Sequence, residues 1–190
     1  APEPPTAWSG TREALAHGPK CPQHEGFDPK DPPLVGDEDC LTLNIFAPAW
    51  QPGEVPDGDA RVPVLVWIHG GDFRTGLGGI PWYAGTRFAN SANIVVVTVN
   101  YRLGALGFTA LGSLGAELKD AGNLGLLDQL AALDWVSKNI ERFGGDPGCV
   151  TIAGESAGAS AVATLLAVPK ARPLFDRAIL QSGHAFNTSW

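Results

Sequence analysis

Two apolar runs stand out along the chain because polar residues do not alternate within them. They are Val62–Ile68 and Ile94–Val99, and both are rich in β-branched residues. Strands that face water on one side alternate between apolar and polar residues, whereas strands covered on both faces do not. The two runs therefore predict buried strands of a largely parallel sheet. A third β-rich segment, Leu41–Phe46, alternates in part and predicts another strand ahead of them.

The second half of the chain predicts alternating helices and strands. Between residues 123 and 143, apolar side chains recur at spacings of three and four, as in an amphipathic helix. Gly144–Pro147 should end it, because glycine caps helices in the left-handed conformation and proline cannot continue one. A strand (Cys149–Ala153), a helix of small residues (Ala157–Val168) and a strand (Arg177–Gln181) follow. This order predicts an α/β fold, with a mostly parallel central sheet and helices on both faces.

Length and composition narrow the function classes. The chain has 190 residues, 44% of them hydrophobic, which is enough for one globular domain with a core. The 24 glycines and 16 prolines favour many turns and argue against a helical bundle. A net charge of −7 disfavours nucleic acid and anionic membrane surfaces as partners. No apolar run approaches the roughly 18 residues of a membrane span, so we expect none.

The cysteines do not form a metal-binding pattern. Cys21, Cys40 and Cys149 have no C-x-x-C spacing and no nearby pair of histidines. We expect no metal ion and no cofactor. One disulfide and one odd thiol would be consistent with this count.

The segment Gly154–Gly158 has the sequence G-E-S-A-G between a predicted strand and a predicted helix. This is the context of a nucleophile elbow, in which an abrupt strand-to-helix turn exposes the serine and glycines leave room beside it. The following helix N-terminus also favours negative charge nearby. Ser156 is therefore the candidate nucleophile, and the alternative is a structural glycine-serine turn.

The loop His69–Phe73 follows a predicted buried strand and contains two adjacent glycines. Glycine lets backbone N–H groups approach a substrate carbonyl, as the stabilisation of a tetrahedral oxyanion requires. The expected donors are the N–H groups of Gly71 and Asp72, together with that of Ala157. The alternative is a plain turn after a strand.

A serine nucleophile needs a general base, and the four histidines of the chain do not supply a convincing one. Downstream of Ser156, Asp176 and His184 flank the last predicted strand at opposite ends, so they cannot both reach the serine. His69 belongs to the glycine loop, where packing or a structural hydrogen bond is its expected role. The residues therefore predict a nucleophile and an oxyanion hole without a base.

Six segments in this order resemble the type-B carboxylesterase and cholinesterase family of α/β-hydrolases. They are Glu38–Asn44, Trp67–Gly71, Asn100–Phe108, Gly122–Gln129, Phe143–Pro147 and Gly154–Gly158. The resemblance implies an α/β-hydrolase fold, with residues 1–190 forming the N-terminal part of one such domain, incomplete at both ends. It also implies that the acid and the histidine of the triad lie outside this chain. The missing remainder of the protein would then be a required partner, and the 190 residues alone should be inactive.

The resemblance implies a serine carboxylic ester hydrolase that forms an acyl-enzyme on Ser156 and acts on small-molecule esters. Many relatives have glycine or alanine at the position of Asp72, whose carboxylate would oppose a developing oxyanion unless it turns away. The alternative is a non-catalytic binding or adhesion protein, as some relatives are.

The resemblance also implies structural pairs. Cys21 and Cys40 match the family's first disulfide, which leaves Cys149 as a buried free thiol. Arg102 and Asp146 are expected to form an ion pair. A disulfide indicates a secreted or periplasmic protein, with a cytoplasmic location as the alternative.

Overall fold

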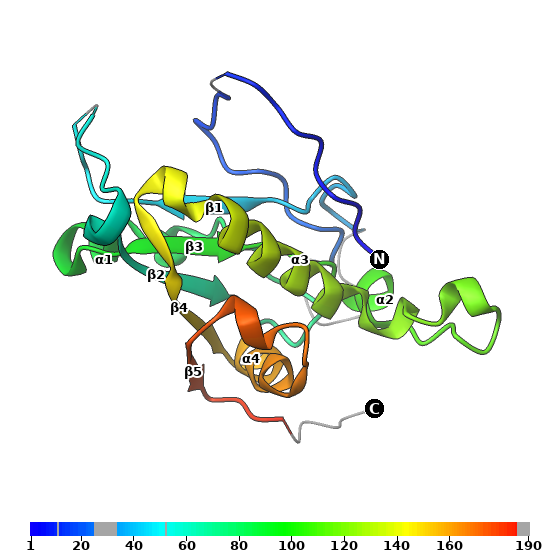
Figure 1. The fold of residues 1–190 in the computed structure, drawn as a ribbon. Helices are drawn as coiled ribbons and strands as arrows, with labels where there is room; N and C mark the ends of the chain where they lie inside the picture. The colour runs from blue at the N-terminus through cyan, green and yellow to red at the C-terminus, as the bar shows by residue number, and fades with distance from the viewer. Residues whose placement is uncertain (11, 25–33, 52, 186–190) are drawn as a thin grey trace.

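The computed structural model describes residues 1–10, 12–24, 34–51 and 53–185. Its sheet contains five strands in the order β1-β3-β2-β4-β5. In Figure 1 this order is followed from the top of the sheet to the bottom. Strand β1 is antiparallel to β3, and the other neighbouring strands are parallel. The strands are β1 (Leu43–Phe46), β2 (Val62–Ile68), β3 (Val95–Val99), β4 (Gly145–Glu155) and β5 (Arg177–Gln181). The mostly parallel sheet of the sequence-based prediction is confirmed.

Four helices accompany the described strands. They are α1 (Thr86–Ala92), α2 (Gly104–Phe108), α3 (Leu124–Asn139) and α4 (Ala157–Ala167). The two long helices lie where their spacing predicts them. Helices α1 and α2 were not predicted, because seven and five residues are too few to show a helical period.

The boundary between α3 and β4 differs from the prediction. After a 3₁₀ turn at Ile140–Phe143, Gly144 adopts φ +72° and ends the helical segment as expected. The strand, however, begins at Gly145, four residues before the predicted start at Cys149. The reason is non-local, since Val62 of β2 pairs with Gly145 across a register shift.

One face of the sheet carries the main core. Val64, Val66 and Ile68 of β2 stand beside alternate residues of β3 and β4, so these side chains share a face. They pack with apolar residues of α3 and α4, and Figure 1 shows both helices on the near side of the sheet. The core cluster from these two helices includes Leu133, Val136, Ala161, Val162 and Leu165.

The opposite face is covered less completely. Helix α1 lies on this side, where Gly85 at its start packs against Val96. The Trp67 ring packs against the Tyr83 ring, with 5.4 Å between the two ring centroids. Strand β3 is buried throughout, as predicted, but β2 is not, because Pro63 is exposed and Trp67 is half-buried. The prediction of full burial was therefore wrong for β2.

The three cysteines divide as the resemblance implies. Cys21 and Cys40 form a disulfide, and both are buried. Cys149 is a free thiol, but it is only half-buried and its Sγ accepts a hydrogen bond from Arg177 Nη1 at 3.4 Å. The prediction of a buried thiol was wrong because Cys149 lies early in β4, near the exposed edge strand β5.

Within the described ranges, no helix is long and apolar enough to cross a bilayer.

Candidate active site

Ser156 lies at the junction between the end of β4 and the first residue of α4. Its backbone has φ +54° and ψ −121°, a conformation that non-glycine residues rarely adopt. Such a residue costs about 1–3 kcal/mol and persists only where the surroundings hold it. Two hydrogen bonds do so here: Ser156 N–H donates to Gln181 O of β5 at 2.9 Å, and Ser160 N–H donates to Ser156 O at 3.0 Å.

The glycines on either side of the serine allow close backbone contact. A Cβ added at Gly158 would overlap the carbonyl oxygen of Ile68, and one added at Gly154 would overlap the backbone of Gly158. The first turn of α4 therefore rests directly on the end of β2. This contact explains why glycine stands at both ends of the motif.

Gly158→Ala should destabilise the full-length protein by about 2 kcal/mol or more, because the added methyl group meets backbone that cannot move aside. The matched control is Gly148→Ala, where an added Cβ would have only Asp146 Oδ1 near it, at 3.3 Å. Gly148 has no positive φ, so its replacement should change stability by less than about 1 kcal/mol. Urea unfolding of both variants checks this, and equal midpoints would contradict the packing argument.

The second glycine motif forms a tight loop after β2. Gly71, Asp72 and Phe73 have φ values of +106°, +57° and +55°. The carbonyl oxygen of Gly71 accepts hydrogen bonds from the N–H groups of Arg74 and Thr75, at 3.0 and 2.9 Å. Asp72 is exposed, so water screens its carboxylate.

The loop and the elbow are in direct contact. A Cβ added at Gly70 would lie 3.2 Å from Ser156 Cβ and 2.7 Å from Glu155 O. Ala157, the third expected donor, is the first residue of α4, whose first-turn N–H groups have no acceptor within the helix. The structure thus brings the predicted nucleophile and the predicted oxyanion loop together.

The two residues considered downstream of the serine, Asp176 and His184, lie at opposite ends of β5, as predicted. Asp176 lies at the start of β5, where its Oδ2 accepts a hydrogen bond from Val150 N–H. Ser156 lies beside the opposite end of β5. His184 lies beyond that other end and is exposed. The part of the chain that is described contains no group of three metal-ligating side chains.

His69 is buried at the start of the glycine loop His69–Phe73. Its ring stacks on the Tyr101 ring at 4.4 Å, and its Nδ1 lies 2.8 Å from Gly70 O, an acceptor. Burial lowers the pKa of His69 to about 4, and the hydrogen bond to Gly70 opposes this shift. Tyr101 O–H donates to His69 O at 2.8 Å, and burial raises the pKa of Tyr101. His69 is therefore neutral and structural near pH 7, which agrees with its expected role.

The depressed pKa of His69 should make stability depend on pH. The unfolded chain takes up a proton near pH 6.5 and the folded chain near pH 4, so this contribution is complete above pH 6.5 and is lost as the pH falls toward 4. Between pH 7 and pH 4 the loss should be about 3 kcal/mol. Urea unfolding of the wild type and His69→Phe checks it, because the variant keeps a ring but has no titrating group. Parallel pH profiles would contradict the assignment.

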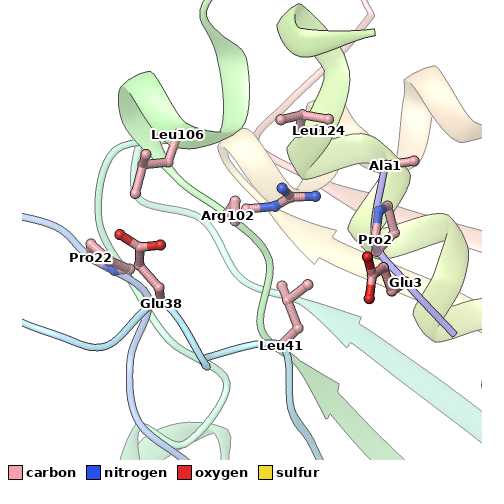
Figure 2. A pocket seen from close by; sticks show the side chains of 9 residues that line it. All are labelled: Ala1, Pro2, Glu3, Pro22, Glu38, Leu41, Arg102, Leu106 and Leu124. Carbon is pink, nitrogen blue, oxygen red and sulfur yellow. The ribbon is translucent and has the colours of Figure 1, made fainter. Parts of the chain in front are cut away.

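The surface also has a hollow of about 360 Å³. Figure 2 shows the side chains that line it. Arg102, Leu106 and Leu124 line one part of it and Glu38 another. None of Ser156, Gly71, Asp72 or Ala157 lines it, so this hollow is separate from the candidate active site.

The family assignment rests on a match over the whole chain. The model of the carboxylesterase family matches residues 1–190. The chain belongs to the carboxylesterase family. Among curated relatives, this carboxylesterase-family chain is 47% identical over 186 residues to para-nitrobenzyl esterase of Bacillus subtilis (strain 168), covering 96% of the chain and 36% of that protein. It is 46% identical over 183 residues to fumonisin B1 esterase of Sphingopyxis macrogoltabida, covering 95% of the chain and 33% of that protein.

Solved structures agree with this carboxylesterase assignment. The carboxylesterase EST55 of Geobacillus stearothermophilus at pH 6.8 superposes with a TM-score of 0.83 at 51% identity, over 97% of the chain and 36% of that protein. The α/β-hydrolase fold is therefore confirmed. The chain spans about a third of the length of these carboxylesterase relatives.

One expectation carried over from carboxylesterase relatives was wrong. Arg102 pairs with Asp128 of α3, not with Asp146: its Nε and Nη2 donate to the two carboxylate oxygens at 2.8 and 2.6 Å. Asp146 instead accepts a hydrogen bond from Gly148 N–H at 2.8 Å within β4. The buried contact of Tyr101 with His69 was not predicted, because the two residues lie far apart in the chain.

Proposed function

We propose that the full-length protein is a serine carboxylic ester hydrolase that acts through an acyl-enzyme on Ser156. The observation that carries this proposal is the contact between two motifs. The strained strand-to-helix turn at Ser156 packs against the glycine loop at Gly70, as nucleophile and oxyanion donors must. Esterase names among the relatives support the same chemistry.

In this proposal, Ser156 Oγ attacks the ester carbonyl carbon and the carbonyl oxygen becomes an oxyanion. The N–H groups of Gly71, Asp72 and Ala157 donate to that oxyanion, and the N-terminus of α4 adds a favourable dipole. The hydroxyl proton passes to a general base and then to the leaving alcohol. Water attacks the acyl-enzyme in the same way, releasing the acid and restoring the serine.

The base and its acidic partner would come from the remainder of the protein. His69 is unsuited to this task, since its ring is buried, stacked and hydrogen-bonded to Gly70. Residues 1–190 alone should therefore be inactive.

We also infer a secreted or periplasmic location, because buried disulfides such as Cys21–Cys40 persist in oxidising compartments. Alkylation and mass spectrometry of the natural protein check this, and free thiols at both positions would contradict it.

A fluorophosphonate probe tests the nucleophile on the full-length protein. We expect one adduct, located by peptide mass spectrometry on Ser156, while the buried hydroxyl of Ser160 stays unmodified. Ser137→Ala, on α3, is the control, and this variant should take up the probe to the same extent as the wild type. A folded protein that takes up no probe would contradict the proposal and favour the alternative, a non-catalytic binding protein.

A further inference from the structure

Gln23 forms hydrogen bonds through both polar atoms of its side chain and through both polar groups of its backbone. It is 7% exposed. Its Nε2 donates to Gly76 O at 2.9 Å and to Cys21 O at 3.0 Å, and its Oε1 accepts from Gly76 N–H at 2.8 Å. Its backbone N–H and C=O both pair with Val35, each at 2.9 Å. The side-chain amide of Gln23 therefore forms hydrogen bonds with both the N–H and the C=O of Gly76.

Gly76 lies against His69 and Gly70, which directly precede the expected oxyanion donors Gly71 and Asp72. A Cβ added at Gly76 would overlap His69 Nδ1 and would lie 2.8 Å from Gly70 O. Thr75, just before it, donates its N–H to Gly71 O and closes the loop. A displacement of Gly76 would therefore move the loop that presents the Gly71 and Asp72 N–H groups.

The segment that holds Gln23 is itself anchored. Cys21 lies two residues before Gln23 and is joined to Cys40 by the disulfide. Asn100 adds a second tie, since its Oδ1 accepts from Gly78 N–H at 2.8 Å and its Nδ2 donates to Cys40 O at 3.1 Å. The loop after β2 is thus fastened to the disulfide-linked segment at two points.

A carboxamide suits the contact with Gly76 because it offers a donor and an acceptor side by side. Methionine would fill a similar volume without either hydrogen bond. Glutamate would keep the acceptor for Gly76 N–H but would place a carboxylate oxygen against the carbonyl oxygens of Gly76 and Cys21. These two substitutions separate the hydrogen bonds from the packing.

We propose that Gln23 is a positioning residue for the oxyanion hole, holding the Gly71–Gly76 loop against the Ser156 elbow through its paired hydrogen bonds to Gly76. The proposal rests on the esterase function proposed above. Gln23 acts through the backbone of the loop, so its effect should appear in the chemical step more than in substrate binding, because misplaced donors stabilise the transition state less.

The test measures kcat and KM with p-nitrophenyl acetate for the full-length wild type, Gln23→Met and Gln23→Glu. We expect kcat to fall by roughly 10-fold or more in both variants while KM stays within about twofold. Binding of a trifluoromethyl ketone, which forms a tetrahedral adduct with the serine, should weaken by a similar factor. Urea unfolding is measured alongside, and both variants should be fully folded under the assay conditions.

The matched control is Asn139→Leu. It removes another carboxamide-to-backbone hydrogen bond, from Nδ2 to Trp135 O at 2.8 Å, at the end of α3 that leads into the start of β4. Ser156 follows the opposite end of β4, so kcat should match the wild type.

The possible outcomes are distinct. A Gln23→Met variant with wild-type kcat and wild-type inhibitor binding would overturn the positioning role. Failure of both variants to fold would assign Gln23 to folding and would overturn it as well. If the wild-type protein takes up no fluorophosphonate at Ser156, the esterase proposal itself fails, independently of Gln23.

Discussion

Ser156→Ala should lower kcat of the full-length protein for p-nitrophenyl acetate on the order of 10⁵-fold, because no acyl-enzyme can form without the hydroxyl. The oxyanion donors are backbone N–H groups, and alanine leaves them in place. We therefore expect a small residual rate above that of water. Steady-state kinetics with a high concentration of the Ser156→Ala protein measures this residual activity.

The control for this experiment is Ser137→Ala on α3, which should retain kcat within about twofold. Circular dichroism should show that Ser156→Ala is folded. Alanine at this position keeps the strained positive φ, so a small loss of stability is compatible with the prediction. Turnover by Ser156→Ala close to that of the wild type would mean that another residue is the nucleophile.

Arg102→Ala should destabilise the full-length protein by about 3–5 kcal/mol, because it leaves the carboxylate of Asp128 buried without its partner. The Asp128 side chain is 1% exposed and receives both guanidinium hydrogen bonds, together with Arg102 N–H at 3.0 Å. The same pairing raises the pKa of Arg102, with the hydrogen bonds to Asp128 as the largest cause. Urea unfolding at pH 7 measures the loss.

An exposed ion pair on the same helix provides the comparison. Lys138 Nζ lies 2.6 Å from Asp134 Oδ2, but their side chains are 68% and 49% exposed. Lys138→Ala should therefore cost no more than about 0.5 kcal/mol. If the two variants unfold at the same urea concentration, burial does not govern the Arg102–Asp128 pair.

Local patterns in the sequence predicted most of the elements that build the site. The β-branched runs predicted β2 and β3, and the three-and-four spacing predicted α3. The motif around Ser156 combined a strand, a glycine-flanked serine and a helix, all within a few residues. Such features are readable because the physical constraint acts between near neighbours in the chain.

Features that depend on distant residues could not be read in this way. The start of β4 at Gly145 depends on pairing with Val62, and the partner of Arg102 proved to be Asp128 on α3. The half-burial of β2 depends on which elements cover each face of the sheet. Strand alternation alone does not say how completely a face is covered.

By itself, the sequence determined the α/β class, the strand-to-helix turn at Ser156, where the nucleophile is expected, and the glycine loop that was expected to supply oxyanion donors. The tertiary structure alone decided that Gly70 packs against Ser156 and that the Gln23 side chain forms hydrogen bonds with Gly76, 53 residues away in the chain. The physical reason is that side-chain periodicity and turn chemistry are local, whereas contacts between loops follow from the strand order β3-β2-β4, which places the ends of β2 and β4 side by side.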